Sequence, residues 1–110
     1  MNESDASTVD LTRFMRSFRE RFHPMHPVEV RRAALADDEW GDTSIVIRKG
    51  EPRFLVRINK ALDKEAQMFV LVHELAHTIQ WRVHEEMRDS DHDAEWGVAY
   101  ARVWEALFGA

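Results

Sequence analysis

The amino-acid sequence predicts a small α+β fold with three helices and a three-stranded sheet. Apolar side chains recur at helical spacing near the beginning, in the middle and at the end of the 110-residue chain. Between the first two of these segments, two runs of β-branched residues flank a turn that contains Gly and Pro. The expected order is therefore a leading helix, a small sheet with a hairpin, a long helix and a closing helix.

The leading helix follows a short polar stretch, residues 1–8, which we expect to be flexible. Asp10 or Thr8 caps the helix. Its apolar side chains repeat at helical spacing: Leu11, Phe14, Met15, Phe18 and Phe22. The helix ends in residues 23–27, because each of the two prolines there restricts its own backbone and that of the preceding residue. Residues 28–35 are the predicted first strand.

The hairpin has the clearest β-strand pattern in the chain. Residues 44–48 and 54–58 are rich in β-branched and aromatic side chains, and residues 49–52 supply the turn between them. An acidic turn, residues 37–42, precedes the hairpin. We therefore expect two antiparallel strands joined by a turn of four residues.

Two further helices complete the predicted fold. The long helix begins at Asn59 or Asp63 and continues to about residue 82. Its inward-facing stripe is Met68, Val72, Leu75, Ile79 and Val83. A charged connector, residues 84–91, leads to the closing helix, which begins at Asp93. The apolar side chains of the closing helix are Trp96, Ala99, Tyr100, Val103, Trp104 and Leu107.

Composition narrows the classes of function. A chain of this length, with 45% hydrophobic and 32% charged residues, is typical of one soluble domain, residues 1–110. Its longest apolar run is too short to span a bilayer, and its first residues do not resemble a signal peptide, so we expect a cytoplasmic protein without a membrane partner. The absence of cysteine excludes thiolate metal ligands. The net charge of −5 makes nucleic acid an unexpected partner.

The long helix contains the motif that predicts chemistry. His73, Glu74 and His77 form an HExxH pattern in a segment without Gly or Pro. Residues four positions apart lie nearly on the same face of a helix, so the two imidazoles can bind one Zn²⁺ ion. Glu74 is then placed to accept a proton from a zinc-activated water during attack on a carbonyl group.

A catalytic zinc site normally has three protein ligands, and the third must come from elsewhere in the chain. The metzincin extension is absent, because Gln80 and Val83 stand where that motif has Gly and His. His84 is seven residues beyond His77, so on a continuous helix it would lie about 10 Å further along the axis. Neither the metzincin pattern nor His84 therefore supplies the ligand.

The predicted third ligand is His92, with Glu95 as the alternative. The connector that precedes His92 is long enough to reverse the chain direction, so the closing helix can pack against the motif helix. Trp96 follows one helical turn later and is expected to anchor this segment in the core. Asp91 or Asp93 can accept a hydrogen bond from a ligand imidazole and so select its tautomer.

In these residues the chain resembles the SprT-like and related minimal zincins. In that group the HExxH helix is followed by a helix that opens with His, as residues 92–96 do here, and the order of elements is similar. The resemblance implies a minimal zincin-like fold in which His73, His77 and His92 bind zinc. It also implies that Glu74 is the general base of a metallopeptidase that hydrolyses peptide bonds.

Other interpretations remain open beside the metallopeptidase. The chain can be a non-catalytic zinc-binding interaction module, or a structural helical domain without metal. Tyr100 can stabilise an oxyanion, although its helical spacing from Trp96 favours a core position. For the peptidase, a peptide or protein substrate is expected to pair with the main chain of residues 54–58, interpreted as an edge strand.

Overall fold

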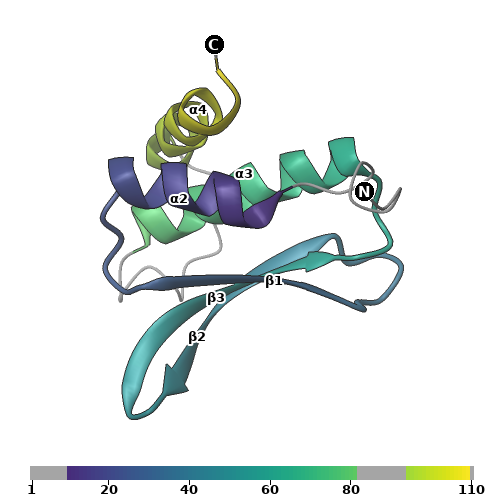
Figure 1. Ribbon diagram of the computed structural model, residues 1–110, viewed down its shortest axis with the longest axis horizontal. Coiled ribbons are helices and arrows are strands. Elements are labelled where there is room, and N and C mark those ends of the chain that lie inside the picture. Colours follow the sequence, from purple (N-terminus) through teal and green to yellow (C-terminus); the bar gives the residue numbers. More distant parts are fainter. Residues whose placement is uncertain (1–9, 82–93, 110) are drawn as a thin grey trace.

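The computed structural model describes residues 10–81 and 94–109. Within these residues the chain forms three helices and three strands: α2 (Leu11–Arg21), β1 (Val28–Ala33), β2 (Gly41–Arg48), β3 (Glu51–Asn59), α3 (Lys64–Gln80) and α4 (Ala94–Phe108). The helices lie together on one side of the sheet (Figure 1). The α+β class and the order of elements predicted from the sequence are confirmed, whereas the predicted flexible residues 1–8 are outside the described part.

The sheet has the strand order β1-β3-β2. The central strand β3 pairs in parallel with β1 and antiparallel with β2. The prediction that residues 54–58 form an edge strand is therefore wrong. The physical reason is burial: Phe54, Val56 and Ile58 are completely buried, and the most apolar strand of a small sheet is best covered when it has a neighbour on each side.

The hairpin is tighter and longer than the pattern of β-branched residues predicts. Its turn is only Lys49 and Gly50, which both have positive φ angles, 52° and 79°, as in a type I′ turn. Residue Pro52, assigned to the turn from the sequence, instead pairs with Ile47 within the ladder. Strand β2 begins at Gly41, inside the predicted acidic turn, because residues 41–43 pair with β3, which the sequence pattern alone does not reveal.

The helix starts follow local capping chemistry. The Asp10 carboxylate accepts a hydrogen bond from the Arg13 N–H at 3.1 Å, and the Asp63 carboxylate accepts one from the Ala66 N–H at 2.8 Å. Such bonds satisfy backbone donors in the first turn of a helix, which lack partners within the helix. Of the two caps considered for each helix, Asp10 and Asp63 are the ones used.

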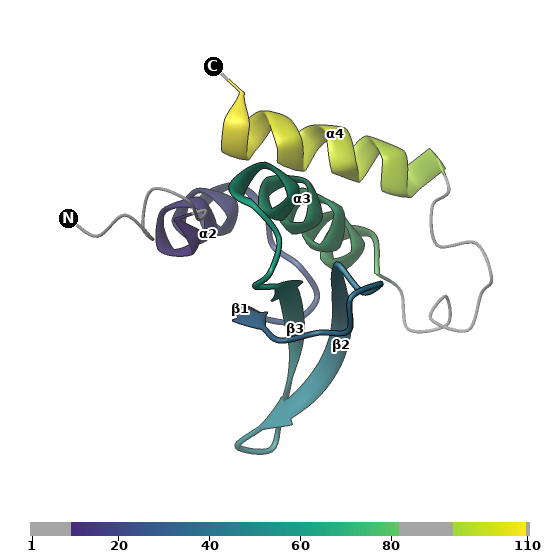
Figure 2. The ribbon, with the colours of Figure 1, turned by 90° about the vertical axis from the view of Figure 1, so that its right-hand side faces the viewer.

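Helix α3 lies between the sheet and α4 (Figure 2). Val72 and Leu75 are buried as predicted, while Met68 and Ile79 are half-buried and Val83 lies outside the described residues. The buried surface is wider than the predicted stripe, because α3 is covered on two sides. Six further side chains of α3 are buried beside those of the predicted stripe: Gln67, Val70, Leu71, Glu74, Ala76 and Thr78. The motif helix is therefore held rigidly in the core.

Helix α4 closes the core from above α3. Ala99, Val103 and Leu107 are buried, and Trp104 is half-buried. Buried residues from all three helices and from β1 and β3 form one hydrophobic cluster. Among the residues described, no helix combines the length and apolar character needed to cross a membrane.

Candidate active site

The two histidines of the motif converge on the exposed side of α3. The Nε2 atoms of His73 and His77 are 3.3 Å apart, and the ring planes are inclined by 70°. Two nitrogen lone pairs at this distance repel each other unless a proton or a cation lies between them. The separation is slightly longer than the about 2.7–3.2 Å of ordinary N–H···O hydrogen bonds. The pair can therefore share a proton in an N–H···N hydrogen bond, and a metal ion can take the place of that proton.

The separation also fits the dimensions of a zinc site. Zinc–nitrogen bonds of about 2.0–2.1 Å with tetrahedral angles place two ligand nitrogens about 3.3–3.4 Å apart. The donor set is chemically suitable, because neutral imidazole is a common zinc ligand and this chain has no cysteine. The separation of the His73 and His77 Nε2 atoms therefore matches that of two ligands of one zinc ion.

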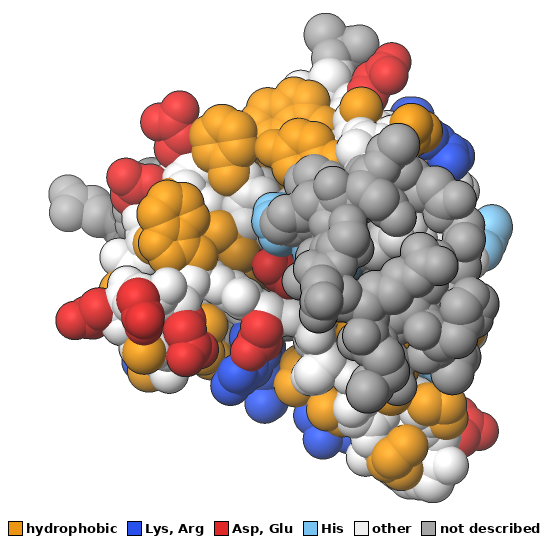
Figure 3. All heavy atoms as spheres, turned by 180° about the vertical axis from the view of Figure 1, so that it is seen from behind, with side chains coloured by type: hydrophobic (Ala, Val, Ile, Leu, Met, Phe, Trp, Pro, Cys, Tyr) orange, Lys and Arg blue, Asp and Glu red, His pale blue; other side chains and the backbone are white. Residues whose placement is uncertain are grey.

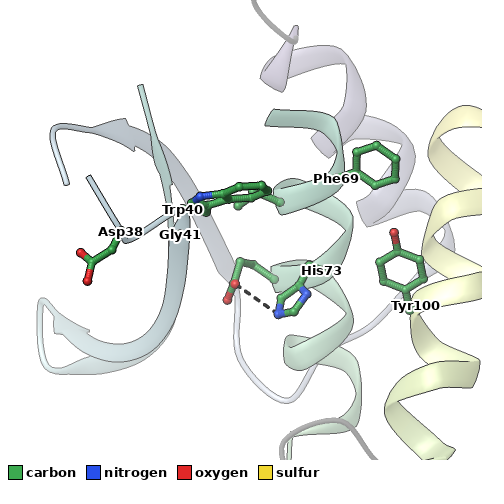
Figure 4. Close-up of a pocket in the computed structure, with 8 residues that line it drawn as sticks. Asp38, Trp40, Gly41, Phe69, His73 and Tyr100 are labelled. Carbon is green, nitrogen blue, oxygen red and sulfur yellow. Dashed lines mark ion pairs between the residues drawn. The ribbon is translucent and has the colours of Figure 1, made fainter. Parts of the chain in front are cut away.

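Glu74 is buried at the side of α3 that faces β2. Its Oε2 atom lies 3.7 Å from the Nε2 atom of His73, a contact marked by the dashed line in Figure 4 that is an ion pair only when His73 is protonated. Its Oε1 atom accepts a hydrogen bond from the Thr43 hydroxyl at 2.7 Å. The two carboxylate oxygens thus have different surroundings: Oε1 is held by the sheet, and Oε2 faces the imidazoles. This is a suitable orientation for a proton acceptor beside a metal site.

A close contact between β2 and α3 positions this carboxylate. Gly41 of β2 contacts Val70 of α3, and Thr43 of β2 contacts Glu74 of α3. The two strand residues are two positions apart, and the two helix residues are one helical turn apart. A Cβ atom on Gly41 would lie 2.5 Å from Val70 Cγ1 and 2.6 Å from the backbone oxygen of Arg57. The strand can approach the helix this closely because residue 41 has no side chain.

Sequence reasoning missed both Gly41 and Thr43. A glycine in a strand often marks a close approach of another backbone or helix, and this signal was present. It was hidden because residues 37–42 were interpreted as a turn.

A pocket of about 600 Å³ opens beside the motif. His73 and Glu74 line it, and Trp40, Phe69 and Tyr100 contribute aromatic rings to its lining. In Figure 4, Trp40 extends from the loop before β2 toward α3, while Phe69 and Tyr100 lie on the opposite side. Figure 3 shows this face of the molecule, with hydrophobic side chains gathered on two sides of a histidine and a carboxylate.

Tyr100 contributes to both the core and the pocket. Its ring is half-buried and stacks with Trp104, with ring centroids 6.4 Å apart, yet it also lines the pocket beside His73. The sequence favoured a core position over a role at the site, because periodicity does not reveal which part of a ring remains exposed. Burial raises the pKa of Tyr100 above its usual 10.0, so the phenol is protonated at neutral pH and can donate a hydrogen bond.

The described residues contain two of the three predicted zinc ligands. Among residues 10–81 and 94–109, no group of three or more His, Asp or Glu side chains is arranged to hold a metal ion. The predicted third ligand His92, the acidic residues Asp91 and Asp93, and the side chains of Glu95 and Trp96 lie outside the described part. Their assignment stays a prediction from the sequence.

Comparison of the chain with protein-family models, with curated proteins and with solved structures finds no match. The interpretation of this site therefore depends on its own residues and geometry.

Proposed function

We propose that this chain is a zinc-dependent metallopeptidase of the minimal zincin type. His73 and His77 bind the zinc ion, and His92 is the third ligand, with Glu95 as the alternative. The observation that carries the proposal is the 3.3 Å separation of the two Nε2 atoms, with the Glu74 carboxylate 3.7 Å from one of them. The pocket at this position gives a peptide access to His73 and Glu74.

The bound zinc supplies Lewis-acid polarisation of the peptide carbonyl and of the attacking water. Glu74 Oε2 accepts a proton from the water as the water oxygen bonds to the carbonyl carbon. The same oxygen then returns the proton to the amine nitrogen as the carbon–nitrogen bond breaks. Thr43 keeps Oε1 on the sheet side throughout, so Oε2 faces the reacting atoms. The protonated phenol of Tyr100 is a candidate donor to the developing oxyanion.

Metal analysis and one conservative variant test this proposal. We expect about one zinc per chain, lost in His73→Ala and retained in Glu74→Gln. Because a general base typically contributes about 10²–10⁴-fold, Glu74→Gln should reduce peptide hydrolysis by at least about 100-fold. Glu65→Gln is the matched control, since Glu65 is exposed in the first turn of the same helix.

Two outcomes would overturn the proposal. Normal hydrolysis by Glu74→Gln excludes Glu74 as the base. Stoichiometric zinc without hydrolysis of any member of a mixed peptide library would instead identify a non-catalytic zinc-binding module.

A further inference from the structure

Two large aromatic side chains are exposed beside the proposed catalytic residues. Trp40 is 56% exposed and Phe69 is 46% exposed, and both line the pocket that contains His73 and Glu74. They come from different parts of the chain, the loop before β2 and the first half of α3. Exposed apolar surface rimmed by polar groups commonly marks a binding site.

The Trp40 side of the pocket is held by the end of the sheet. The Asn59 N–H donates a hydrogen bond to the Trp40 carbonyl at 2.8 Å. The Asn59 side-chain amide donates to the carbonyls of Glu39 at 2.9 Å and Ala36 at 3.2 Å. Asn59 is itself buried. The backbone that carries Trp40 is therefore fixed, although the indole ring is exposed.

The opposite side is supported by stacked aromatic rings. Phe69 stacks on Trp104 with ring centroids 5.3 Å apart and an interplanar angle of 25°. Trp104 in turn stacks with Tyr100. These stacked side chains are already ordered, so they lose little conformational entropy when a ligand binds. Less of the free energy of their apolar contact with the ligand is therefore offset by ordering.

We propose that Trp40 and Phe69 form a specificity subsite for an aromatic side chain of the peptide substrate, next to the scissile bond. This inference rests on the proposed peptidase function. An aromatic ring can make edge-to-face or offset contacts with these aromatic side chains, which a small aliphatic side chain cannot. Asp38, an exposed carboxylate on the same pocket, favours a basic residue beside the aromatic one and disfavours an acidic one.

Binding to the Glu74→Gln chain tests the subsite independently of hydrolysis. The probes are three capped dipeptides, N-acetyl-Phe-Lys-amide, N-acetyl-Ala-Lys-amide and N-acetyl-Phe-Glu-amide, titrated by NMR. We expect Phe-Lys to bind roughly tenfold more tightly than Ala-Lys. In the same background, Trp40→Ala should remove most of this preference, and Trp40→Phe should retain it. Asp38→Asn should reduce the preference for Phe-Lys over Phe-Glu.

Ile47→Ala is the matched control, because Ile47 is 63% exposed on β2 and does not line the pocket. This variant should bind all three probes as the parent chain does. Similar Tm values for Trp40→Ala and Ile47→Ala would show that removal of the exposed Trp40 ring does not unfold the protein.

The failure of the subsite and the failure of the peptidase proposal give different results. If the wild-type chain cleaves Phe and Ala peptides at equal rates, and Trp40→Ala changes neither, the subsite is refuted and the peptidase stands. If the Glu74→Gln chain shows the Trp40-dependent preference but the wild type cleaves no peptide, the peptidase is refuted and the aromatic pocket stands. Equal binding of Phe-Lys and Ala-Lys refutes the subsite directly.

Discussion

Replacement of Thr43 by Val tests how the proposed base is held. The substitution removes one hydroxyl and keeps the β-branched shape of the side chain. In the folded protein this hydroxyl donates to Glu74 Oε1 at 2.7 Å, and Glu74 is only 8% exposed. Water can therefore replace the lost donor only poorly.

The expected magnitude follows from the charge and burial of the acceptor. Hydrogen bonds to charged groups contribute about 1.5–3 kcal/mol, so Thr43→Val should lower the free energy of unfolding by that amount. With a urea m-value of about 1–3 kcal/mol/M, the unfolding midpoint should fall by about 1 M. Thr43→Ser, which keeps the hydroxyl, should recover most of the loss.

A double-mutant cycle with Glu74→Leu isolates the Thr43–Glu74 contact. Once the carboxylate is replaced by an apolar group, Thr43→Val should cost much less, because the acceptor that remains for the hydroxyl is the Glu74 backbone carbonyl at 3.3 Å. Urea unfolding of the four chains gives the coupling energy. An equal cost of Thr43→Val in both backgrounds would show that the hydroxyl does not stabilise the carboxylate, and would refute the reasoning.

The kinetics of Thr43→Val distinguish a residue that positions Glu74 from one that contacts the substrate. If Thr43 acts through Glu74, then kcat should fall by roughly 10- to 150-fold, the rate equivalent of the same energy, while KM changes little. Thr43→Ser should restore kcat. A raised KM with normal kcat would instead assign Thr43 to substrate binding.

Three further predictions concern the structure around the site. Gly41→Ala should lower the free energy of unfolding by about 1–3 kcal/mol, because its Cβ would lie 2.5 Å from Val70 Cγ1. An unchanged midpoint in urea titrations would contradict the close approach of β2 to α3. Asn59→Ala should cost about 1–3 kcal/mol and change the Trp fluorescence, because the buried Asn59 amide makes two hydrogen bonds to the loop that carries Trp40. An unaltered spectrum and midpoint contradict this role. The hydrogen bond from Arg48 lowers the pKa of Glu29 below its usual 4.5, so its stabilisation is present above pH 4.5 and lost as the pH falls through the lowered value. The difference in Tm between wild type and Glu29→Gln should therefore disappear in acid, and a difference that persists there contradicts the pairing.

The helical part of the fold was predictable because its determinants are local. Asp10 and Asp63 cap helices through hydrogen bonds to residues three positions away, and helical periodicity identified Phe18 and Val103 as core residues. The four-residue spacing that brings His73 and the second histidine together is likewise a property of one helix. None of these features requires knowledge of distant residues.

The sheet was less predictable because its order depends on pairing between distant segments. Residues 54–58 have the same local pattern whether they lie at the edge or in the centre, and only the parallel pairing with β1 places them in the centre. The beginning of β2 was missed for a related reason. Gly41 and Thr43 belong to the strand because β3 and α3 hold them there, whereas their own neighbours in sequence suggest a turn.

The pocket combines both kinds of information. Trp40 and Phe69 could be recognised as aromatic residues, but their shared exposure beside the motif depends on where the loop before β2 meets α3. The same is true of Tyr100, whose periodicity correctly indicated packing and could not indicate that part of the ring lines a cavity.

The motif and the strand therefore contribute different parts of the proposed chemistry. Helix geometry places the two imidazoles on one face, where their Nε2 atoms can reach a separation suited to zinc. Helix geometry does not orient the Glu74 carboxylate, because its side chain can adopt several rotamers. Here the Thr43 hydroxyl selects one orientation, and Gly41 allows the strand to come close enough to do so. We therefore expect loss of the strand contact to leave zinc affinity nearly unchanged while hydrolysis slows, which separates metal binding from catalysis within one motif.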